Sequence, residues 1–161
     1  MGETLNDNLT GAESAGVSAM GKTNWTRVIL GGLLAGVVFN IILFAASAIY
    51  LDDLFGPALK ALNPNYQETT GSLIFWIVLN FVSGILVVWL YSAIRPRYGA
   101  GPKTALILGL VLWIMGPLTL DSILGVMQLF PGTTLVVDAI TGLVMFVVGT
   151  LAGAWIYEEQ E

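Results

Sequence analysis

The sequence predicts an all-α, polytopic membrane protein with four transmembrane helices in an antiparallel bundle and a short interfacial helix on the outer side. Of its 161 residues 56% are hydrophobic and only 11% are charged. With a mean hydropathy of +0.82, the chain is too apolar for an ordinary soluble domain. Four apolar stretches are also long enough to cross a hydrocarbon core of about 30 Å, which takes about 20 helical residues. They cover residues 28–51, 72–94, 104–130 and 134–157.

Two other classes of protein are excluded by simple patterns. Strands of a β-barrel alternate apolar and polar residues, whereas runs such as "VILGGLLAGVVF" and "GILVVWLY" do not alternate. The chain contains no cysteine and no histidine, which removes disulfides, thiolate metal sites, histidine-ligated haem and Ser-His or Cys-His nucleophiles. We therefore expect no enzyme, no catalytic residue, no metal, no cofactor and no nucleic-acid partner.

The two ends of the chain are polar. Residues 1–24 are rich in Gly, Ser, Thr and Asn and are acidic. They lack the positive first region and short apolar core of a cleavable signal peptide, so we expect a tail that is retained. Residues 158–161 form an acidic end after the last apolar stretch.

The positive charges predict how the chain is oriented. Lys22 and Arg27 precede the first span, and Arg95, Arg97 and Lys103 lie between the second and the third. The sixth cation lies in the first outer loop. Because cytoplasmic loops carry the excess of Lys and Arg, both termini are expected in the cytoplasm.

The two outer connections differ. Residues 52–62 carry apolar side chains at the spacing of one helical face, with aspartates to cap the start and Asn63-Pro64 to stop it. This pattern predicts a short helix lying on the outer surface. The second connection is a bare "FPGTT", so the third and fourth spans should be antiparallel neighbours.

Each span carries one conspicuous polar residue: Asn40, Asn80, Asp121 and Asp138. Counted from the outer ends at about 1.5 Å per residue, all four fall in one layer of the outer half. No span contains Lys or Arg, so the two aspartates must be protonated, share a proton, bind a cation or touch water. The layer is therefore a candidate intramembrane polar site.

The surroundings of Asp121 suggest a proton or Na⁺ site. Pro117 should kink the third span beside it, and Thr119, Ser122 and Thr141 could add oxygen ligands. The alternative is structural, because Asn and Asp commonly make interhelical hydrogen bonds. Asp138 also lies close enough to a helix N-terminus to be reached by water.

Small residues form flat stripes on the first and last spans. Gly32 and Gly36 make one such stripe, and Gly149 and Gly153 make the other. Stripes with this spacing let a second helix approach closely. The second helix could belong to the same chain or to another subunit.

The segment "RPRYGAGPK" concentrates Arg95, Arg97 and Lys103 without a carboxylate. The cluster serves as a topology signal without any partner. It could also hold anionic lipid head groups or an acidic protein, or make weak exposed pairs with the carboxylates of the chain's own acidic end.

Three segments carry a resemblance: "RVILGGLLAGVVFN", "WLYSAIRPRYGAGPKTALI" and "VVGTLAGAWIYEE". Over residues 25–159 the chain resembles a group of small bacterial four-helix membrane proteins of uncharacterised function. The resemblance implies the four-helix fold and a bacterial inner-membrane location. It brings no activity with it.

Two functions are compatible with these features. The first is a non-catalytic accessory subunit of a larger bacterial membrane complex, an energy-converting one such as a photosynthetic reaction centre with antenna or a respiratory assembly. Its partners would be lipids and other membrane subunits. The second is a small proton- or cation-conducting homo-oligomer that works through Asp121 and Asp138.

Overall fold

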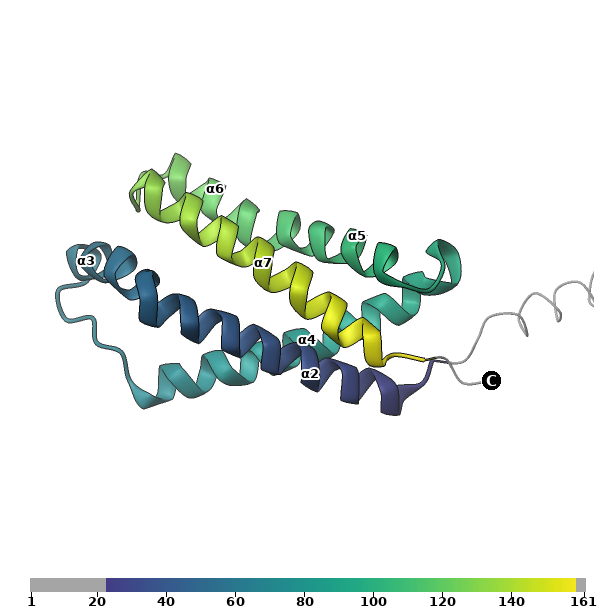
Figure 1. Cartoon of the computed structure of the whole chain (residues 1–161). Coiled ribbons are helices and arrows are strands. Elements are labelled where there is room, and N and C mark those ends of the chain that lie inside the picture. The colour runs from purple at the N-terminus through teal and green to yellow at the C-terminus, as the bar shows by residue number, and fades with distance from the viewer. Residues whose placement is uncertain (1–22, 159–161) are drawn as a thin grey trace, which may run out of the picture.

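The computed structural model of the chain describes residues 23–158. Of the predicted tail only Thr23 and Asn24 fall in this range, and of the predicted acidic end only Glu158; the remainder lies outside the described residues. Within this range every regular element is a helix. Four helical runs are long and apolar enough to cross a membrane, which supports the predicted multi-pass membrane protein (Figure 1).

The first helical run is longer than the predicted span. Helix α2 (Trp25–Ala46) begins after Asn24, whose side chain accepts a hydrogen bond from the first turn as an N-cap. It passes through a π-helical turn, η1 (Ser47–Leu51), directly into α3 (Asp52–Leu62). Figure 1 shows α2 from the side and α3 nearly along its axis, so the chain changes direction at η1. The position of α3 at the membrane surface stays a prediction.

The second run is helix α4 (Thr70–Tyr98). It begins with a capping box, in which the side chains of Thr69 and Ser72 each accept a hydrogen bond from the other's backbone N–H. Two arginines of the basic cluster lie in its last turn. The helix ends at Gly99, whose φ of 87° lies in the region that favours glycine.

The third run is interrupted near its middle. Helix α5 (Pro102–Trp113) leads through the π-helical turn η2 (Ile114–Leu118) into α6 (Thr119–Val126). The turn contains Pro117, which has no N–H to donate to the helix. Helix α6 ends before the predicted limit at residue 130, because the chain reverses through a turn in which Gln128 has a φ of 56°.

Helix α7 (Gly132–Ile156) is the fourth run. Helix α2 packs against α4 and α7, and α7 packs against α5, η2 and α6. Figure 1 shows α7 lying between α2 and the run formed by α5 and α6. The main cluster of buried hydrophobic residues lies where these helices meet; it consists of Val28, Ala35, Phe39, Val87, Val88, Tyr91, Ala105, Leu108 and Tyr157.

Both predicted glycine stripes are used inside the chain. Gly84 of α4 lies against the backbones of Gly32 and Gly36, and a Cβ added to it would stand 2.6 Å from the Gly36 nitrogen. On the adjacent face of α2, a Cβ added to Gly31 would stand 2.6 Å from the carbonyl oxygen of Gly153. These distances are too short for a carbon atom, so only glycine allows α4 and α7 to touch α2 in this way.

Substituting Gly84 with alanine should therefore destabilise the fold. The added methyl group meets backbone rather than a movable side chain, and we expect the free energy of unfolding to fall by about 1–3 kcal/mol. Unfolding of the purified protein by denaturant in detergent measures the change. The matched control is Gly56→Ala, since no atom lies within 4 Å of the added carbon; equal stability of the two variants would contradict the close crossing.

Candidate functional site

The two aspartates of the spans lie together. The side chains of Asp121 in α6 and Asp138 in α7 are close neighbours. Asp121 is only 5% exposed, and its Oδ2 has no hydrogen-bond partner among the described residues. Asp138 is partly buried, and neither α6 nor α7 contains a Lys or Arg. Because a carboxylate has no donor, two neighbouring carboxyl groups can form a hydrogen bond with each other only when one of them carries a proton.

A regular ladder of contacts places Asp121 against α7. Five residues of the third run that contact or neighbour α7 are spaced four apart. In chain order the contacts are Gly109 with Val147, Trp113 with Ala139, Pro117 with Gly142, Asp121 with Asp138, and Gly125 with Leu135. Asp121 therefore belongs to the packed face of the run and not to its lipid-facing side.

The π-helical turn helps to keep this ladder in line. In a regular α-helix each fourth residue is displaced by about 40° around the axis, because 3.6 residues complete a turn. Residues spaced four apart would therefore move progressively around the helix axis and no longer face α7. A π-helical turn contains more residues, so η2 opposes the rotation between Trp113 and Asp121.

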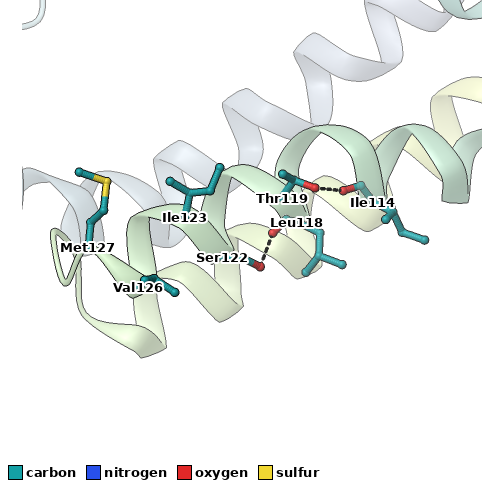
Figure 2. A pocket seen from close by; sticks show the side chains of 7 residues that line it. All are labelled: Ile114, Leu118, Thr119, Ser122, Ile123, Val126 and Met127. Carbon is teal, nitrogen blue, oxygen red and sulfur yellow. Dashed lines mark hydrogen bonds between the residues drawn. The ribbon is translucent and has the colours of Figure 1, made fainter.

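Two of the three hydroxyls expected to complete a cation site bond elsewhere. Thr119 donates to the carbonyl oxygen of Ile114 at 2.5 Å, and Ser122 donates to that of Leu118 at 2.6 Å. Figure 2 shows both bonds within their own helical run. The two hydroxyls are exposed and line a shallow groove of about 440 Å³, together with Ile114, Leu118, Ile123, Val126 and Met127.

The third hydroxyl connects α7 to the first helical run. Thr141 donates to the carbonyl oxygen of Val137, and its Oγ1 lies 2.8 Å from the hydroxyl of Tyr50 in η1. Tyr50 is not among the predicted site residues, and no spacing in the sequence indicates this contact because it depends on the bend at η1. A cavity of about 250 Å³ lies beside it, lined by Ile42, Tyr50, Val137, Ile140, Thr141 and Val144.

The two asparagines form a separate pair between α2 and α4. The Asn80 amide donates to Asn40 Oδ1 at 3.2 Å, and the Asn40 amide donates to the carbonyl oxygen of Gly36 at 2.8 Å. Both side chains are buried. This is the interhelical hydrogen bonding that the structural alternative predicts.

The two polar pairs also lie at different depths. Gly31 and Gly153 mark a common level, because their backbones touch. Counted outward from that level at about 1.5 Å per residue, Asn40 lies roughly 14 Å away and Asp138 roughly 22 Å away. The structure thus gives two pairs in place of the single layer.

The basic cluster lies around the connection between α4 and α5. The guanidinium of Arg95 lies over the ring of Tyr157, 5.4 Å from its centroid, in a cation–π contact. Arg97 and Lys103 are exposed. Arg95 therefore helps to dock the C-terminal end of α7, and the two exposed cations remain available to lipid head groups or an acidic neighbour.

The connection itself is held by specific hydrogen bonds. The backbone N–H of Gly101 donates to the Tyr91 hydroxyl at 2.9 Å, and the Thr104 hydroxyl donates to the carbonyl oxygen of Gly99 at 2.7 Å. Gly101 has a φ of 123°, which side chains disfavour. The Pro- and Gly-containing segment is thus a fixed turn.

The acidic end meets a different cation from those of the cluster. Glu158 Oε2 lies 3.0 Å from an Arg27 nitrogen; the Glu158 side chain is largely exposed and that of Arg27 is partly exposed. An exposed pair of this kind contributes little stability. Glu159 and Glu161, the other expected partners, lie outside the described residues.

Comparison of the chain with protein families, curated proteins and solved structures finds no match. The resemblance to small bacterial four-helix membrane proteins therefore stays a prediction.

Proposed function

We propose that the chain is a non-catalytic accessory subunit of a larger bacterial membrane complex, with an energy-converting assembly such as a photosynthetic reaction centre or a respiratory complex as the candidate host. In this proposal the four helices cross the inner membrane as an antiparallel bundle. Both termini are cytoplasmic, and α3 lies along the outer surface. The partners are lipids and other membrane subunits.

The observation that carries this proposal is the outer half of α4. No residue from Thr70 to Leu79 is buried, whereas buried positions recur along the helix from Asn80 onward. Figure 1 shows this part of α4 diverging from α2. We call it the outer α4 surface; its exposed apolar residues are Leu73, Ile74, Phe75, Trp76, Val78 and Leu79.

A helix of another subunit would fit this surface. Membrane helices associate through close packing and interhelical hydrogen bonds, since lipid is as apolar as their side chains. From Thr70 to Leu79 only Ser72 and Ile77 are even partly buried, so the chain itself provides little such packing there. The glycine stripes are not available for docking because they pack inside the chain, so the outer α4 surface is assigned this role in their place.

Removing the two aromatic side chains should release the chain from its complex. Phe75 and Trp76 are 60% and 52% exposed, and their rings contact each other edge to face. We expect Phe75→Ala/Trp76→Ala to leave the free energy of unfolding within about 0.5 kcal/mol. In mild detergent extracts of native membranes, the particle containing the chain should become smaller on native gels.

The control for this experiment is Trp155→Ala, which removes an aromatic side chain that is 84% exposed on α7. It should leave the size of the particle unchanged. A wild-type chain that migrates alone, or a double variant that stays in a particle of full size, would sink the accessory role of this surface.

Proton or cation conduction is the second candidate, and the carboxyl pair of Asp121 and Asp138 favours it. An ionisable group inside a membrane span commonly marks an ion pathway. Inward along α7, however, the next polar side chain after Thr141 is Thr150, roughly 14 Å away. Conduction would therefore need the helices of a second copy to complete the pathway, as in a homo-oligomer.

Replacing both aspartates should abolish flux if the chain conducts. Proteoliposomes containing Asp121→Asn/Asp138→Asn should lose acidification of the lumen under an imposed potential, as read by a pH-sensitive dye. The control is Asp52→Asn/Asp53→Asn, which changes two exposed aspartates of α3. Wild-type flux no greater than that of protein-free vesicles would eliminate this candidate.

A further inference from the structure

The pair of Asp121 and Asp138 has a feature that helix packing does not explain. If the pair served packing alone, we would expect the buried oxygens of Asp121 to have hydrogen-bond partners. Asp121 is only 5% exposed, yet its Oδ2 has no hydrogen-bond partner in the described part of the chain. An ionised pair would be costly there, because a buried charge without a partner is strongly disfavoured. The pair therefore needs a ligand that removes charge.

A metal cation fits this position poorly. Hard cations take about six or more oxygen ligands, whereas Thr119 and Ser122 donate to carbonyls of their own helical run and Thr141 contacts Tyr50. Over residues 23–158 no three Asp, Glu, His or Cys side chains gather in a way that could hold a metal. A proton needs only the pair, because one carboxyl then donates to the other.

The surroundings also indicate the side from which a proton arrives. Asp138 is partly exposed and lies about 9 Å along α7 from Gly132, at the outer end of the helix. In the opposite direction α7 is apolar between Thr141 and Thr150. The path for proton exchange with water is therefore shorter on the outer side, through Asp138. Asp121 is the more enclosed member of the pair.

We infer that Asp121 and Asp138 together bind one exchangeable proton taken from the outer side of the membrane. The bound proton lies in the hydrogen bond between the carboxyl groups and leaves the pair with a single negative charge. Its release leaves two carboxylates that repel each other across α6 and α7. If the chain conducts, as in the second proposed function, this site identifies the proton as the ion that it carries. The site is equally compatible with an accessory subunit that conducts nothing.

Infrared spectroscopy of the full chain in lipid nanodiscs tests this site. The carbonyl stretching band of a protonated carboxylic acid should be present at neutral pH in sodium-free buffer, with an intensity of a single carboxyl per chain. It should shift in D₂O. It should be absent in Asp121→Asn/Asp138→Asn and unchanged in Asp52→Asn/Asp53→Asn, whose aspartates are exposed.

Three outcomes would overturn the inference. The first is a wild-type spectrum without the band, which needs no variant to fold. The second is a band that persists in the double aspartate variant of the spans. The third is loss of the band when sodium replaces choline in the buffer, which would identify a metal cation as the ligand. Flux is measured separately, so the band without flux would eliminate conduction and leave the proton site standing.

Discussion

Backbone contact at two adjacent glycines of α2 determines where the other helices lie. Gly32 faces α4 at Ile85, and Gly31 faces α7 at Gly153. Because the hydrophobic effect does not drive helices together in lipid, such close approach supplies much of their packing energy. Helix α7 in turn receives the third run at Gly142, against Pro117. The glycines of α2 thus position α4 and α7, and α7 positions the third run.

This order of packing explains the placement of the polar residues. The crossing of α2 and α4 brings Asn40 to Asn80, where the Asn80 amide donates to Asn40 and the Asn40 amide donates to a backbone carbonyl. The ladder between α7 and the third run brings Asp121 to Asp138, where a carboxyl oxygen is left over. The first arrangement needs no ligand, whereas the second is complete only with a proton.

The sequence predicts some of these features well and others not at all. The four spans follow from local hydropathy, which needs no knowledge of neighbours. Which helix each glycine stripe contacts depends on the crossing geometry. The sequence alone therefore does not show that Gly32 and Gly153 pack inside the chain. The bend at η1, the phase correction at η2 and the contact of Tyr50 with Thr141 depend on backbone turns that composition does not specify. The four polar residues can therefore be found from the sequence, but not their division into two pairs.

Disulfide formation tests this division into two pairs directly. The chain contains no cysteine, so pairs can be introduced without a background of native thiols. Two cysteines form a bridge only when their Cα atoms lie within about 7 Å. In native membranes under oxidation, Asp121→Cys/Asp138→Cys should cross-link within the chain, whereas Asp121→Cys/Asn40→Cys should not. Efficient cross-linking of the second pair, with none of the first, would contradict the arrangement described for α2, α6 and α7.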